Sequence, residues 1–156
     1  MQKTAFLANR IREVFLNGTW IANTNYKATL ETTDWGIAVQ KQDAANSIAA
    51  LTFHVNYYLA GLLNVFRGGN LEISDALSFD MPPISGQADW ATLVAALLDN
   101  AEAFAQTIES MEDAALDLPF VDARYGSILR NIEGVIEHSY YHLGQIVLLK
   151  KIHQIS

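Results

Sequence analysis

Apolar residues recur every three or four positions in four separate stretches of this chain. That spacing places them on one face of an α-helix, which turns once every 3.6 residues. The four stretches predict helices near residues 2–17, 46–67, 89–111 and 124–153. No stretch shows the strict apolar–polar alternation of a half-buried strand. The pattern therefore predicts an all-α fold, and four amphipathic helices of this length favour a four-helix bundle.

Residues that favour helix ends flank these stretches. The expected caps are Asn46 or Ser47 for the second helix, Asp89 for the third and Asp122 for the fourth. Each has a short polar side chain that can accept a hydrogen bond from a free backbone N–H of the first turn. Gly68-Gly69 is expected to end the second helix, because glycine tolerates the left-handed conformation of a helix cap.

Two of the connecting segments are long. Residues 19–45 are polar and threonine-rich, and we expect them to pack on the bundle through Trp20 and Trp35. A short helix is expected after Thr33-Asp34. Residues 69–88 are expected to form a loop or crossover, because their consecutive prolines are excluded from a helix interior. A loop of this length often shapes the rim of a pocket.

The composition narrows the functional class. With 156 residues and 51% hydrophobic content, residues 1–156 are expected to form a single domain with a sizeable core. Seventeen acidic against ten basic residues, with no basic stripe, argue against a nucleic-acid partner. No run approaches roughly 18 apolar residues and no signal-peptide core is present, so we expect a soluble, cytoplasmic protein without a membrane partner. The chain has no cysteine, so any metal must be held by nitrogen and oxygen atoms.

Three of the four histidines fall on or beside the inward faces of predicted helices. His138 and His142 are one turn apart on the last helix, and His54 lies on the second. Three neutral imidazoles from two helices make a three-nitrogen metal site with open positions, which is the layout of a catalytic site. The alternative is that His54 is an ordinary partly buried histidine and that the other pair is a coincidence. His153, in a lysine-rich last turn, is expected only to complement the helix dipole.

Two further residues are candidates for the lining of a ligand pocket. Gly134 lies one turn before His138, and a glycine inside a helix costs about 1 kcal/mol relative to alanine. Its missing side chain either leaves room for a ligand or allows close helix packing, and both interpretations stand. Tyr58 lies one turn after His54 and is also expected to line the pocket.

Metal-bound histidines need hydrogen-bond partners for their second ring nitrogen. The candidates for that role are Asn131, Glu137 and Gln145, and the pattern does not choose among them. No nucleophile elbow, Walker loop or dinucleotide-binding fingerprint is present.

Two segments resemble a known family. The first, NSIAALTFHVNYYLAGLL, fits the pattern S-I-x-x-L-x-x-H-x-x-x-Y with Ser47, Ile48, Leu51, His54 and Tyr58. The second, IEHSYYHLGQIVLLKK, fits H-x-x-x-H-x-G-Q-I with His138, His142, Gly144, Gln145 and Ile146. Together, in this order and at this separation, they resemble the DinB-like (DinB/YfiT) superfamily over essentially the whole chain.

The resemblance implies an up-down-down-up bundle and a divalent metal, often nickel or zinc, bound by His54, His138 and His142. It also implies a homodimer. Relatives include thiol transferases that use low-molecular-weight thiols, and a thiol-dependent isomerase. The favoured function is therefore a metal-dependent enzyme that activates a low-molecular-weight thiol, or secondly water, against a small-molecule substrate. The alternatives are a non-catalytic metal or small-molecule binding module, and a helical dimer with a structural metal.

Overall fold

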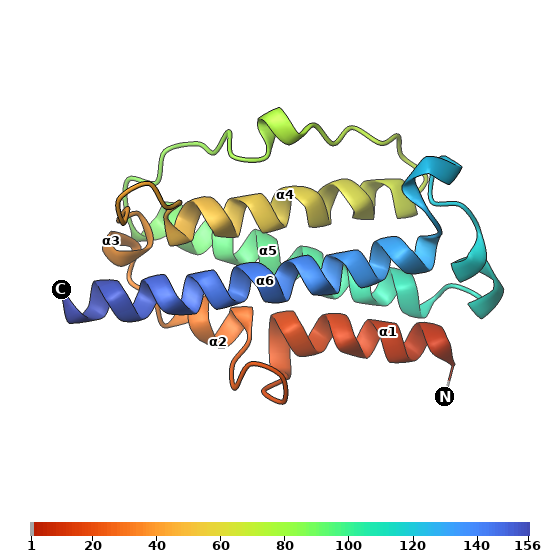
Figure 1. Cartoon of the computed structure of the whole chain (residues 1–156), viewed down its shortest axis with the longest axis horizontal. Coiled ribbons are helices and arrows are strands. Elements are labelled where there is room, and N and C mark those ends of the chain that lie inside the picture. Colours follow the sequence, from red (N-terminus) through yellow and green to blue (C-terminus); the bar gives the residue numbers. More distant parts are fainter. Residues whose placement is uncertain (1) are drawn as a thin grey trace.

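Four long helices lie side by side in the computed structural model, which describes residues 2–156 (Figure 1). They are α1 (Lys3–Arg12, continued by the π-helical η1 at Glu13–Asn17), α4 (Ile48–Phe66), α5 (Gln87–Glu109) and α6 (Ile128–Ile155). Helices α1 and α6 run in one direction, and α4 and α5 run in the opposite one. Within residues 2–156 no strand forms, and the all-α, up-down-down-up prediction is confirmed.

The apolar stripes of the sequence form the core between these helices. Helix α5 packs against both α1 and α4, and α6 packs mainly against α4. The largest fully buried side chains include Ile11, Phe15, Leu59, Leu97, Phe104 and Ile132, with one or more from each of the four helices. Burying such side chains contributes about 1.5–3 kcal/mol each and fixes which face of each helix points inward.

The helix ends differ from the prediction at two of three caps. Ser47 caps α4 as expected, accepting a hydrogen bond from the Ala50 backbone N–H. Helix α5 begins at Gln87, so Asp89 lies inside its first turn and accepts bonds from the backbone and hydroxyl of Ser85. Asp122 caps the short helix η4 (Ala123–Tyr125) instead of α6. The last long helix begins later, at Ile128, with Ser127 as its cap.

The segment after α1 docks on the bundle through different residues from those expected. It contains α2 (Tyr26–Glu31) and α3 (Trp35–Ala38). Helix α3 follows Thr33-Asp34 as predicted, and Asp34 caps it. The buried Tyr26 hydroxyl donates a hydrogen bond to the Ser139 carbonyl at 2.7 Å. Trp35 is half-buried against the core, but Trp20 is 88% exposed, so its predicted packing is wrong. Trp20 lies in the turns before α2, outside the part of the segment that Tyr26 ties to α6.

Residues 67–86 connect two parallel helices, and the connection therefore travels back along the length of α4 (Figure 1). It holds one short helix, η2 (Asp75–Leu77). Two tyrosines of α4 fix it in place: the Tyr57 hydroxyl accepts a bond from the Ser74 backbone N–H, and the Tyr58 hydroxyl donates to Asp75 at 2.6 Å. The predicted crossover, residues 67–86, thus lies along α4 and is hydrogen-bonded to it; we call it the strap.

Helix α4 is long and apolar enough, by length and composition alone, to be a candidate membrane span, and it is the one such helix in the described part of the chain. In the structure it is a bundle helix that packs against α5 and α6. Its apolar residues include Leu51, Val55, Leu59 and Leu63, which are all buried in the core. Packing within the bundle accounts for the composition of this helix.

Candidate metal centre

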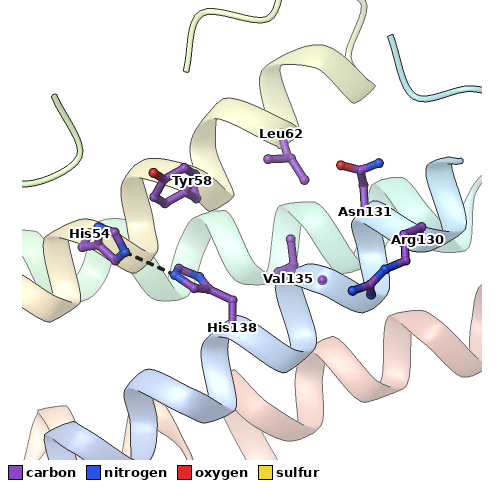
Figure 2. A pocket seen from close by; sticks show the side chains of 8 residues that line it. His54, Tyr58, Leu62, Arg130, Asn131, Val135 and His138 are labelled. Atoms are coloured by element: carbon purple, nitrogen blue, oxygen red, sulfur yellow. Dashed lines mark hydrogen bonds between the residues drawn. The ribbon is translucent and has the colours of Figure 1, made fainter. Parts of the chain in front are cut away.

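The three predicted histidines meet between α4 and α6. The Nε2 atom of His138 lies 3.2 Å from Nε2 of His54 and 3.0 Å from Nε2 of His142. Figure 2 shows the rings of His54 and His138 pointing toward each other from the two helices. One donor atom from each of the three histidines lies within 4.8 Å of the others. The structure therefore brings together residues 84 positions apart in the chain at one point.

These separations fit a shared metal ion. Two nitrogens bound at about 2.1 Å to one ion, at angles between 90° and 110°, lie roughly 3.0–3.4 Å apart. Both measured Nε2 distances, 3.0 and 3.2 Å, fall in that range. Hydrogen bonds alone explain these contacts poorly. The Nε2 atom of His138 carries at most one proton, which it can donate to only one of the two neighbouring nitrogens.

Gln145 orients one of the three rings. The Nδ1 atom of His142 lies 2.6 Å from the Gln145 amide oxygen, which can only accept a hydrogen bond. The proton of a neutral His142 ring is then on Nδ1, and the lone pair of Nε2 faces the other two histidines. Of the three candidate partners for the imidazoles, Gln145 is the one in contact. Asn131 bonds to backbone carbonyls at the start of α6, and Glu137 pairs with Arg130.

The crossover closes the other side of the cluster. The Phe79 ring stacks on the His54 ring, with centroids 4.2 Å apart and planes 10° apart. Tyr58 meets the edges of both His54 and His138. Within residues 2–156, the buried Nδ1 of His54 has no hydrogen-bond partner of good geometry, although the Ser78 backbone is near enough to favour its protonated form. His54 is thus held by aromatic packing.

The environment favours neutral imidazoles. Burial, aided by the nearby His142 and His54, lowers the pKa of His138 from 6.5 to about 4. Burial also lowers the pKa of His54, with a contribution from His142. Burial lowers the pKa of His142 as well, although this ring donates a hydrogen bond to Gln145, which raises the pKa. Only a neutral imidazole coordinates a metal, so the three rings are in the ligand-competent form at pH 7.

A cavity of about 480 Å³ opens beside the cluster. Its lining residues come from α4 and α6: His54, Tyr58, Leu62, Arg130, Asn131, Gly134, Val135 and His138 (Figure 2). Tyr58 and Gly134 were both expected there. A Cβ atom built on Gly134 meets no described heavy atom within 4 Å outside its own helix turn, so close helix packing does not require this glycine. The structure favours the interpretation that Gly134 leaves room for a ligand.

His153 differs from its prediction. Its side chain is buried at 8% exposure, and within the described chain its Nε2 atom makes no hydrogen bond. It lies eleven residues, or about three turns, beyond His142, too far along α6 to join the cluster. The amphipathic pattern of α6 continues to its last turn, so this histidine faces the core instead of the solvent.

Sequence reasoning missed three residues near the site. Phe79 and Asp75 lie in the crossover, where no periodicity relates a residue to a helix face. Arg130 carries a usable signal, because it precedes Gly134 and His138 at steps of four residues and so belongs to the same row along α6.

Comparison with known families supports the resemblance noted in the sequence. The sequence profile of the DinB superfamily matches residues 23–146, which include all three histidines. No curated protein and no solved structure matches this chain.

The lowered histidine pKa values predict a pH-dependent stability of the metal-free protein. Below about pH 6.5 the histidines of the unfolded chain bind protons, whereas those of the folded cluster stay neutral. The free energy of unfolding therefore decreases as the pH is lowered. We expect a loss on the order of 2 kcal/mol between pH 7 and pH 5, because the folded pKa of His138 is about 4. Urea unfolding at both pH values measures this loss. The variant His138→Asn should lose less stability between pH 7 and pH 5, because it lacks the ring whose pKa is lowered most. Equal stability of the wild type at pH 7 and pH 5 contradicts this electrostatic picture.

The open space at Gly134 predicts a stabilising substitution. Gly134→Ala adds a side chain where no described atom interferes, and alanine favours the helix over glycine. We expect the free energy of unfolding to rise by about 0.5–1 kcal/mol. Gly126→Ala serves as the control and should destabilise, since Gly126 has φ 77°. Destabilisation by Gly134→Ala shows that this side of α6 is packed.

Proposed function

Because this chain belongs to the DinB superfamily, we propose that His54, His138 and His142 bind one divalent metal ion, zinc or nickel. We further propose that the protein is an enzyme that uses this ion to activate a low-molecular-weight thiol against a small electrophile. One observation carries the proposal: the Nε2 atoms of His142 and His54 lie 3.0 and 3.2 Å from Nε2 of His138, beside an open cavity. Neutral imidazoles suit both metals.

The chain's own residues position the donors and limit the access of water. Gln145 fixes the His142 ring, and the stacked Phe79 fixes the His54 ring. The strap, tethered by the Tyr58–Asp75 bond, covers the α4 side of the cluster. When bound, a divalent ion would lower the pKa of a coordinated thiol or water and supply a nucleophile near neutral pH. The cavity of about 480 Å³ then has room for a small substrate beside the donors.

The cavity lining favours a thiol over water as the nucleophile. No aspartate or glutamate is among its described lining residues, and the chain has no cysteine. Hydrolysis by a metal site usually relies on a nearby carboxylate as general base. A thiol, with a reference pKa near 8.5, needs far less help to ionise than water does. Thiol transfer is therefore our first proposal, and hydrolysis the second.

The open cavity also bears on the non-catalytic alternatives. A structural metal is usually enclosed by four protein ligands, whereas three histidines converge here. A ligand could complete the shell from the cavity that His54 and His138 line. This arrangement favours a reactive site over a metal staple between two helices.

The metal proposal predicts the behaviour of four single variants. The purified protein should bind one zinc or nickel ion, and alanine in place of His54, His138 or His142 should remove most of the affinity, because two ligands remain. His153→Gln, which lies outside the cluster, should keep it. Elemental analysis after reconstitution measures the stoichiometry. Occupancy should fall only in acid, below the usual histidine pKa of 6.5, because burial lowers the pKa of all three rings. A metal-free wild type, or binding that depends only on His153, contradicts the proposal.

The thiol proposal predicts metal-dependent consumption of a thiol. Zinc- or nickel-loaded protein, mixed with bacillithiol, glutathione or mycothiol and a generic electrophile, should form the thioether faster than the metal-free protein. Gly134→Leu should reduce this rate several-fold while keeping the metal, because it narrows the cavity without removing any of the three histidines. Full metal occupancy without any thiol turnover, across all three thiols, favours hydrolysis or a binding module.

A further inference from the structure

A row of residues along α6 links the metal-binding histidines to a single cation. Arg130, Gly134 and His138 follow one another at steps of four residues and all line the cavity of about 480 Å³. Gly134 leaves the middle of this row without a side chain, and no described heavy atom beyond its own turn fills the space. One cavity is therefore lined by both His138 and Arg130, and no side chain at position 134 divides it (Figure 2).

Arg130 is the one charged side chain among the described lining residues, apart from the histidines. Its presence contrasts with the acidic chain as a whole, which has a net charge of -7. Between the two ends of the cavity lie Leu62 and Val135, which offer apolar walls. The lining thus has electron-pair donors for a metal at one end, an apolar middle and a cation at the other end.

The guanidinium is available to a ligand. Its partner in the structure is Glu137, at 3.1 Å, and the two side chains are 58% and 62% exposed. An exposed ion pair of this kind contributes little, because water screens both charges and two long side chains must be ordered. A carboxylate of a ligand inside the cavity can replace Glu137, and an arginine binds a carboxylate through two parallel N–H groups.

We propose that Arg130 binds a carboxylate of the substrate or thiol that occupies this cavity, so that the site selects small carboxylate-bearing ligands. This inference rests on the proposed function only in that the donor atom of the ligand binds the metal; the contact with Arg130 does not depend on it. One guanidinium, beside an acidic Glu137, matches a monoanion better than a phosphate dianion. Arg130 is in this view a specificity-determining residue and takes no part in the bond changes.

The helix geometry limits the length of the ligand. Arg130 and His138 are eight residues apart, which corresponds to about 12 Å along α6. The guanidinium extends toward the C-terminal end of α6, where it meets the Glu137 carboxylate, so the distance from the guanidinium to the His138 ring is shorter than this. A ligand with its donor atom and its carboxylate separated by several single bonds fits, whereas a three-carbon acid is too short.

The test compares 6-mercaptohexanoate with 6-mercaptohexanol on cobalt-loaded protein, using the thiolate-to-cobalt charge-transfer absorption as the measure of binding. The wild type should bind the acid about tenfold more tightly than the alcohol, as expected for one charge-assisted contact. Arg130→Gln should remove this preference without changing the affinity for the alcohol. The matched control Arg124→Gln, an equal change of charge on the exposed η4, should keep it. With 3-mercaptopropionate, the wild type and Arg130→Gln should differ by less than about twofold.

A second arm needs no metal. Hexanoate and hexanol are titrated into the metal-free protein, and the backbone amide resonances of Asn131 and Gly134 report binding. An acid preference that depends on Arg130 supports the inference even if cobalt does not bind, in which case the proposed function alone fails. If cobalt binds and the acid preference is absent, or is unchanged in Arg130→Gln, this inference is wrong while the metal site stands.

Discussion

Three imidazole nitrogens that converge on one point, with that of His138 in contact with the other two, impose the main constraint on this structure. With Nε2 separations of 3.0 and 3.2 Å, His138 faces two neighbours with one proton to share. A cation that accepts all three lone pairs removes this conflict, and protonation does not, because burial holds the pKa of His138 near 4. The surrounding parts serve the same end. Gln145 sets the tautomer of one ring, and Phe79 stacks on another.

Sequence periodicity recovers those parts of the site that lie on helices. The spacing of His138 and His142, and the apolar residues around His54, were enough to place all three on facing surfaces. A residue in a loop has no such signal, and for that reason Phe79 and Asp75 emerge only in three dimensions. Trp20 shows the opposite error: its size suggested burial, but no local pattern could tell that Tyr26 would anchor the segment instead.

The caps show a second limit of local reasoning. Asp122 makes the bond expected of a capping residue, but it caps η4 and not α6, which begins at Ile128. Asp89 lies inside α5 and accepts its bonds from Ser85, which precedes the helix. Short polar side chains can hydrogen-bond the backbone of several kinds of turn, so they do not by themselves determine where a long helix begins. Tertiary contacts determine that position. His153 illustrates the same limit. Its place in a lysine-rich last turn suggested only an interaction with the helix dipole, whereas the side chain is buried on the inward face of α6.

The parallel arrangement of α4 and α5 has a consequence for how such a protein can diversify. Two parallel helices need a connection that spans the length of a helix, and here that connection, residues 67–86, also covers His54 through Phe79. Helix α4 carries His54, whereas the strap carries Phe79 and Asp75. Phe79 stacks on the His54 ring, and Asp75 accepts a hydrogen bond from Tyr58, whose ring packs against His54. Substitutions or length changes in the strap can therefore alter the packing around His54 and Tyr58 while the helices that hold the donors stay intact. Part of the packing around the donors is thus encoded in a segment that can vary in sequence and length independently of the helices that carry them.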